Sequence, residues 1–178
     1  MNIFEQRELL KSFCILHDSR EQDTERARKR YLSFGCGHDR ATLDYGDYTW
    51  NATLPDGRQI LDISNTIKPI CAIERKMNLD ELAGCFTASR ERFQREFERA
   101  KDNGCRIYLI VENASWENLL NGKYRSKLHP NAFAASVSAW TVRYNMNLIF
   151  CKEETSGRLI KEILYRDLKE RVERGEFG

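Results

Sequence analysis

Hydrophobic residues along this chain occur in two patterns that alternate from one end to the other. Short segments rich in apolar or aromatic residues, which predict strands, occupy residues 13–18, 42–52, 58–63, 70–73, 105–112 and 147–152. Segments that predict helices occupy residues 21–34, 79–100, 131–144 and 159–172. Strands and helices that alternate in this way indicate an α/β domain, with the strands in the middle and the helices outside.

The apolar run at residues 70–73 leads directly into Glu74, Arg75 and Lys76. Because side chains alternate along a strand, Glu74 and Lys76 face one side of the predicted sheet and Arg75 faces the other. A carboxylate beside an ammonium suits a nuclease that uses a hard divalent cation: the carboxylate holds the metal, and the ammonium orients water and offsets phosphate charge. Asp47, on an earlier predicted strand, can complete such a site. The alternative is a simple ion pair between Glu74 and Lys76 on a surface strand.

Several motifs share one order and spacing with a known family. The dipeptide Gly-Asp at 46–47 is followed by Glu-Arg-Lys at 74–76 and, after three residues, by Asp80. Upstream, an apolar segment ends in Asp-Ser-Arg-Glu at 18–21, and downstream residues 107–112 read Ile-Tyr-Leu-Ile-Val-Glu. These segments resemble the GD…ERKxxxD signature and the neighbouring strands of XPF-type nucleases, the ERCC4-domain branch of the PD-(D/E)XK superfamily.

The resemblance extends over residues 13–165 and implies a fold and a domain organisation. The implied fold is a three-layer, restriction-endonuclease-like α/β fold with a central mixed sheet flanked by helices. We expect residues 1–12 to be an N-terminal lead-in and residues 13–178 to be one nuclease domain, without the helix-hairpin-helix module of many relatives. Domains of this type are dimers, which implies a homodimer or a heterodimer.

For function, the resemblance implies a Mg²⁺-dependent DNA endonuclease in which Mn²⁺ can substitute. The implied substrate is branched or flap DNA, in repair or recombination, and a phage or mobile element is one expected source. The implied catalytic residues are Asp47, Glu74, Lys76, Asp18, Asp80 and Arg75, of which Asp47 and Glu74 bind the metal. The implied supporting residues are Arg20, Glu21 and Arg90. The alternative function is a non-catalytic DNA-binding or scaffolding partner in a heterodimeric nuclease.

Two of these acids also have a purely structural interpretation. Asp18 ends a strand, where open sheets present their ligands. Glu21 lies three residues later, however, so Asp18 can also be the N-cap of the helix expected over residues 21–34. Asp80 falls in the first turn of a helix capped by Asn78, where the helix dipole stabilises any carboxylate. The sequence leaves both alternatives open.

Basic residues outside the motifs provide candidate phosphate contacts. Winding residues 79–100 as one helix places Arg90 within an apolar stripe, where it needs a partner. Arg90 also resembles the arginine of an Arg-x-x-x-Gln pair in the family, which predicts contact with the scissile phosphate; the alternative is an ion pair with Glu112. Lys123, Arg125 and Lys127, spaced by an aromatic residue, suit a phosphate backbone. A polar loop between helices is the alternative there.

Composition limits the remaining possibilities. Charged residues make up 31% of the chain but the net charge is +2, so any contact with nucleic acid has to be local. The six cysteines form no CxxC pair and several lie in apolar strands, which favours a reducing compartment and argues against zinc. The sequence shows neither a leader-like start nor an apolar stretch of membrane-spanning length. We therefore expect an intracellular protein, cytoplasmic or in the nucleoid of a prokaryote or nuclear in a eukaryote, that binds DNA and no membrane.

Overall fold

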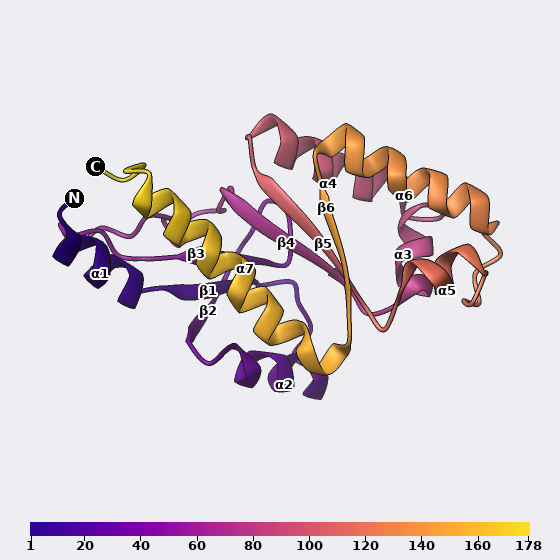
Figure 1. Ribbon diagram of the computed structural model, residues 1–178, viewed down its shortest axis with the longest axis horizontal. Coiled ribbons are helices and arrows are strands. Elements are labelled where there is room, and N and C mark those ends of the chain that lie inside the picture. Colours follow the sequence, from indigo (N-terminus) through magenta and orange to yellow (C-terminus); the bar gives the residue numbers. More distant parts are fainter.

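The computed structural model describes residues 1–178 and places one six-stranded sheet between two layers of helices (Figure 1). The strands are β1 (Cys14–Asp18), β2 (Gly37–Ala41), β3 (Tyr48–Asn51), β4 (Cys71–Lys76), β5 (Arg106–Glu112) and β6 (Asn147–Cys151). Their order across the sheet is β2-β1-β3-β4-β5-β6, and only β3 runs antiparallel to its neighbours. The mixed three-layer α/β fold expected from the sequence is therefore confirmed.

The helices divide between the two faces of this sheet. One face is covered by α1 (Ile3–Lys11), α2 (Glu25–Phe34) and α7 (Glu153–Glu173). The other is covered by α3 (Leu79–Cys85), α4 (Arg90–Asp102), α5 (Trp116–Leu120) and α6 (Pro130–Tyr144). Each layer encloses its own apolar core, with Trp50 buried beneath α7 and Trp140 buried beside α4. Burial of this apolar surface is the main favourable contribution to folding.

Strand β4 contributes to both cores and so determines where its charged end points. Cys71 and Ile73 are buried in the core beneath α7, whereas Ala72 between them packs beneath α3 and α4. Since side chains alternate along a strand, Glu74 continues on the α4 face and Arg75 on the α7 face. The contacts described below agree with this, so the predicted separation of these two side chains is confirmed.

Helices α2 and α7 approach each other closely at Gly157 of α7. A Cβ atom at this position would lie 2.6 Å from the backbone oxygen of Arg30 in α2. Real Cβ atoms do not come this close to backbone oxygen, so the absence of a side chain permits the contact. The close packing holds the segment of α2 that carries Arg30.

The expectation of one continuous helix over residues 79–100 is wrong. The first helix ends at Cys85, with Phe86 as its C-cap, and the second begins at Arg90. A turn joins them, in which the backbone N–H of Ser89 donates to the oxygen of Gly84. The apolar stripe looked continuous because residues on both sides of the turn pack into the same core.

Two expected strands also differ from the structure. Only residues 48–51 of the segment 42–52 are in a strand, and residues 58–63 form none, although Gln59 makes an isolated bridge with Thr53. Strand β2 was not expected, because it lies at the sheet edge and residues 37–40 are exposed, so no apolar run marks it. The helix expected from residue 21 begins at Glu25, with Thr24 as its N-cap.

None of the helices combines the length and the apolar composition that crossing a lipid bilayer requires. The longest, α7, has 21 residues and carries acidic and basic side chains along its length. All six cysteines are free thiols.

Candidate active site

The direction of the strands brings the charged segments to one edge of the sheet. Strands β1, β4 and β5 point the same way, so Asp18, residues 74–76 and Glu112 all lie at their carboxyl ends. Strand β3 runs the opposite way, so Asp47, which precedes it, lies at the same edge. Tyr48 pairs with Ile73 across β3 and β4, and this register sets Asp47 beside Glu74.

A cavity of about 280 Å³ opens at this edge, on the α4 face of the sheet. Five residues expected from the sequence line it: Asp18, Arg20, Asp47, Glu74 and Lys76. Four further charged residues that line it all come from α4: Arg92, Arg95, Glu96 and Arg99. The cavity is therefore walled by the sheet edge on one side and by one face of α4 on the other.

Asp47 is held by the backbone of the neighbouring strand. Its carboxylate Oδ2 accepts from the backbone N–H of Arg75 at 2.7 Å, and its own N–H donates to the oxygen of Ile73 at 2.7 Å. Before it, Gly46 adopts φ +76° and donates its N–H to Glu96 Oε1 at 3.1 Å. Asp47 is thus fixed against the backbone of β4, and the residue before it is held by the side chain of Glu96 in α4.

Gly46 is needed for this approach, and replacement by alanine tests it. We expect Gly46→Ala to cost about 2–4 kcal/mol, because left-handed backbone is strained for alanine and the new Cβ would lie 2.9 Å from the Cβ of Ala72. Gly57→Ala is the matched control, since Gly57 has φ +86° but open space around it. We expect that variant to lose only about 1–2 kcal/mol. Chemical unfolding of both variants measures the difference, and equal losses would contradict the close approach.

Glu74 and Lys76 form an ion pair at the back of the cavity. Lys76 Nζ lies 2.5 Å from Glu74 Oε1, and the Glu74 side chain is only 5% exposed. Burial and the neighbouring Asp47 raise the pKa of Glu74, because a second negative charge in a desolvated site is unfavourable. Burial alone would lower the pKa of Lys76, but Glu74 and Asp47 outweigh it and raise that pKa. Lys76 therefore stays protonated.

The donor set at this edge fits a hard divalent cation. Asp47 and Glu74 offer carboxylate oxygens, and their mutual repulsion favours a bound positive charge between them. The side chains of His, Cys, Asp and Glu form no group of three or more that could enclose an ion by itself. Mg²⁺ is usually bound by one or two carboxylates while water and substrate oxygens complete its shell, so Asp47 and Glu74 are the side chains that would hold it.

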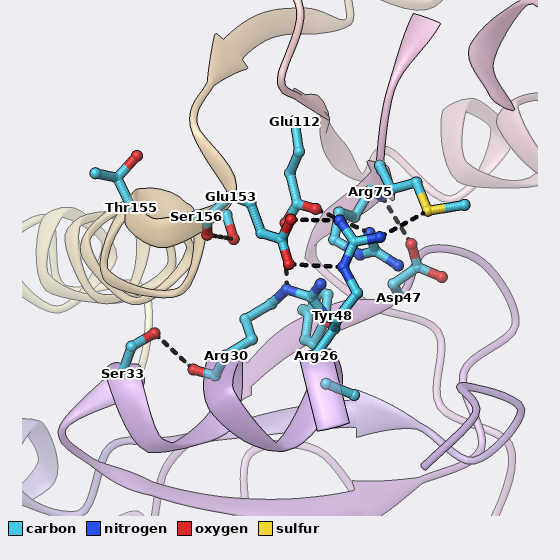
Figure 2. A network of polar contacts seen from close by, with 12 residues as sticks. Arg26, Arg30, Ser33, Asp47, Tyr48, Arg75, Glu112, Glu153, Thr155 and Ser156 are labelled. Carbon is cyan, nitrogen blue, oxygen red and sulfur yellow. Dashed lines mark hydrogen bonds and ion pairs between the residues drawn. The ribbon is translucent and has the colours of Figure 1, made fainter. Parts of the chain in front are cut away.

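On the other face of the sheet, Arg75 enters a buried ion-pair network (Figure 2). Its Nη1 lies 3.2 Å from Glu112 Oε2, and Arg30 Nε lies 3.3 Å from Glu112 Oε1. Arg30 Nη1 also contacts Glu21 Oε1 at 3.1 Å and the hydroxyl of Tyr48 at 3.0 Å. We call Glu21, Arg30, Tyr48, Arg75 and Glu112 the buried brace.

The buried brace lies directly behind the catalytic candidates. Glu112 is fully buried and the Arg30 side chain is only 4% exposed, so the two arginines need these two glutamates as partners. Tyr48 follows Asp47 in the chain, and Arg75 stands between Glu74 and Lys76. The sequence placed Glu21 and Arg75 near the site, but it did not identify Arg30 or Tyr48, and it offered Arg90 only as an alternative partner of Glu112.

Asp18 and Arg20 belong to the cavity wall. Arg20 Nε lies 2.6 Å from Asp18 Oδ2, and Arg20 Nη2 donates to the backbone oxygen of Leu43 at 2.8 Å. The alternative that Asp18 caps the next helix is wrong, because Thr24 is the N-cap of α2. Asp18 is thus free of a capping role, and its carboxylate is only 6% exposed.

Two groups of candidate residues lie outside the cavity. The Asp80 carboxylate accepts hydrogen bonds from Arg125 and Ser126 and does not line the cavity. The loop that contains Lys123, Arg125 and Lys127 does not line it either. Arg90 is also outside it: the side chain is exposed at the first residue of α4 and makes no ion pair with Glu112. The inward position predicted for Arg90 is wrong because the turn before α4 breaks the assumed helical winding.

The sequence analysis did not identify Glu96, Arg92, Arg95 or Arg99 as site residues. In the structure Glu96 accepts from Gly46, and burial together with Asp47 raises its pKa. Arg92 and Arg95 make no ion pair, whereas Arg99 pairs with Asp44 at 3.0 Å. Arg92 and Glu96 are four residues apart and therefore lie on one face of α4, which was the available signal. The assumption of one continuous helix gave the wrong helical phase, so the sequence did not show that this face lines the cavity.

Comparison with known proteins gives one family and several solved structures, among them two of XPF from Aeropyrum pernix. The ERCC4 domain model matches residues 17–163. XPF from Aeropyrum pernix superposes with a TM-score of 0.59 at 17% identity, covering 86% of this chain and 61% of that chain. XPF from Aeropyrum pernix in complex with DNA gives 0.59 at 18% identity, covering 88% and 65%. The chain thus spans less than two thirds of these structures, and at this identity the likeness shows the fold. No curated protein matches the sequence.

Proposed function

Because the chain belongs to the ERCC4 domain family, as its motifs predicted, we propose that it is a divalent-metal-dependent endonuclease that hydrolyses DNA phosphodiester bonds. The observation that carries the proposal is the meeting of Asp47, Glu74 and Lys76 in one cavity at the sheet edge. Glu74 and Lys76 belong to β4, and Asp47 directly precedes β3, which pairs antiparallel with β4. Their chain neighbours Tyr48 and Arg75 belong to the buried brace. A structural ion pair would not require a second carboxylate in the same desolvated cavity.

In this proposal each residue has a role that its surroundings support. Asp47 and Glu74, with the backbone carbonyl that follows Glu74, hold Mg²⁺ or Mn²⁺. The bound ion supplies a Lewis acid and lowers the pKa of a water molecule. Lys76, whose Nζ lies 2.5 Å from Glu74 Oε1, orients the attacking water and offsets phosphate charge. Asp18 and Arg20 complete the wall on the β1 side.

The proposal also includes a path for the DNA backbone. Arg92 and Arg95 are exposed, unpaired cations at the rim of the cavity, and guanidinium groups bind phosphate oxygens well. XPF from Aeropyrum pernix has been solved with DNA, which supports DNA as the substrate class here. Branched DNA, such as flaps and forks in repair or recombination, is the first substrate to test. A dimer is part of the same proposal.

Removal of both rim arginines should weaken DNA binding and reduce its salt dependence. We expect Arg92→Ala/Arg95→Ala to lower the slope of log Kd against log salt by about 2, because each lost phosphate contact removes nearly one unit. Fluorescence anisotropy with labelled duplex at several salt concentrations measures this slope. Arg7→Ala/Arg158→Ala is the matched control, since these exposed, unpaired arginines belong to α1 and α7 in the other helical layer. An unchanged slope in the rim variant would exclude this path.

The function itself is tested by incubating the protein with labelled fork, flap and linear duplex DNA. We expect cleavage with Mg²⁺ or Mn²⁺, none with chelator, and faster cleavage of branched than of linear DNA. DNA binding without cleavage under all metal conditions would instead favour the non-catalytic partner of a heterodimeric nuclease. Absence of both binding and cleavage would refute the proposal.

A further inference from the structure

The carboxylate of Asp80 does not face the cavity but accepts hydrogen bonds from a loop that lies 45 residues later in the chain. Its Oδ1 accepts from the backbone N–H of Arg125 at 2.6 Å and of Ser126 at 3.0 Å. Its Oδ2 accepts from Arg125 Nε at 3.1 Å. Burial raises the pKa of Asp80, but the hydrogen bonds from Arg125 and Ser126 outweigh it and lower that pKa below its usual value. All the bonds recorded for this carboxylate go to residues 125 and 126.

The loop that Asp80 holds exposes its cations to solvent. Exposure alternates along residues 123–128, so that every second side chain is exposed and the others are half-buried. The exposed side chains are all cationic: Lys123, Arg125 and Lys127. On the buried side, the Tyr124 ring packs edge-on against Phe133 and its hydroxyl donates to the oxygen of Leu128 at 2.7 Å. Between Tyr124 and Leu128, Asp80 accepts hydrogen bonds from the backbone of Arg125 and Ser126.

Helix α3 connects this loop to the cavity. Glu81, the residue after Asp80, places Oε1 4.0 Å from Lys76 Nζ. Cys85, at the other end of α3, lines the cavity itself. Since α3 has only seven residues, the loop is attached within two turns of the catalytic candidates. The loop is thus hydrogen-bonded to the first turn of a short helix whose other end lines the cavity.

We propose that Asp80 is a latch that orders the 123–127 loop as a phosphate-binding arm beside the active site, and that it is a positioning residue rather than a metal ligand. This inference rests on the proposed nuclease function. Without the latch, the backbone N–H groups of Arg125 and Ser126 lose their partner and the loop gains conformational freedom. DNA binding must then order the cationic side chains, which reduces affinity without altering the chemistry at Asp47 and Glu74.

Two substitutions at Asp80 separate this role from metal binding. Asp80→Asn keeps the Oδ1 acceptor for both backbone N–H groups, whereas Asp80→Ala loses it, and both variants change the net charge equally. We expect Asp80→Ala to raise the Kd for branched DNA about 5- to 10-fold and to speed trypsin cleavage after Lys123, Arg125 and Lys127. The kcat at saturating DNA and its Mg²⁺ requirement should stay within about 2-fold. Asp80→Asn should behave like the parent in all four measurements.

The control is a second aspartate that accepts hydrogen bonds in another turn, and two results would overturn the latch. Asp56→Ala removes a similar carboxylate, which caps the backbone N–H and Nε of Arg58 in another turn, and should leave Kd unchanged. Equal losses of kcat in Asp80→Asn and Asp80→Ala, with unchanged Kd, would assign Asp80 to the metal and overturn the latch. Tighter DNA binding by Asp80→Ala, the result of charge removal alone, would overturn it as well. Kd and trypsin cleavage are measured without divalent cation, so these two measurements test the latch whether or not the protein cleaves DNA. Failure of the parent to cleave DNA with divalent cation would refute the nuclease function alone.

Discussion

Lys76→Ala and Asp47→Asn should each slow DNA cleavage at saturating substrate by roughly 100- to 1000-fold or more, the usual effect of losing one preorganised charge in an active site. Lys76 lies in a desolvated pair with Glu74, and both proposed metal ligands, Glu74 and Asp47, raise its pKa. Asp47 supplies one of only two side chains proposed to hold the metal. Single-turnover cleavage of labelled branched DNA over a range of Mg²⁺ concentrations measures both effects. Asp47→Asn should also raise the Mg²⁺ concentration needed for half-maximal rate, whereas Lys76→Ala should not.

Lys68→Ala is the matched control for the loss of one positive charge. Lys68 is exposed and precedes the start of β4, at the opposite edge of the sheet. Its replacement should leave the cleavage rate unchanged. Circular dichroism and thermal unfolding confirm that Lys76→Ala and Asp47→Asn remain folded. Cleavage that persists in folded forms of both variants would refute the assigned site.

Glu112→Ala should produce the largest loss of stability among single substitutions in the buried brace, about 3–5 kcal/mol. Glu112 is fully buried and is the shared partner of Arg30 and Arg75, so its removal leaves two largely desolvated guanidinium groups short of negative charge. For a domain of this size the loss corresponds to a decrease in Tm of roughly 6–20 °C. Calorimetry or urea unfolding measures it.

The comparison for this variant is an exposed ion pair. Glu173→Ala breaks the Lys169–Glu173 pair of α7, in which the glutamate side chain is 52% exposed. Exposed pairs contribute about 0–1 kcal/mol, so the Tm of this variant should change by a few degrees at most. If Glu112→Ala is no less stable than Glu173→Ala, the buried brace does not stabilise the fold. Removal of Glu112 also releases the Arg75 side chain, and the backbone N–H of Arg75 holds Asp47. We therefore expect Glu112→Ala to cleave DNA more slowly than the parent.

The chemistry of the site could be read from the sequence because strands alternate. The apolar run before Glu74 identified a buried strand, and period-two alternation then placed Glu74 and Lys76 on one face and Arg75 on the other. The structure puts Asp18, Arg20 and Asp47 in the same cavity as Glu74 and Lys76. Local pattern therefore determined the family, the α/β fold and the residue types that meet at the sheet edge.

Other features depended on residues far apart in the chain. Arg30 contacts Glu112, 82 residues away, from a helix that packs closely against α7 at Gly157. Asp80 meets Arg125, 45 residues away, through a loop whose path no local pattern specifies. A single turn between α3 and α4 changed the helix phase, so that Arg90 faces outward while Glu96 faces the cavity.

By itself, then, the sequence determined which side chains carry the proposed chemistry and on which strand face they lie, since alternation and apolar burial act over a few residues. The tertiary structure alone decided which charges are partners. Ion pairs and loop contacts form between whichever groups the packing of helices brings together, and that packing is set by the two cores as a whole. Charge partners separated by many residues leave no periodic trace along the chain.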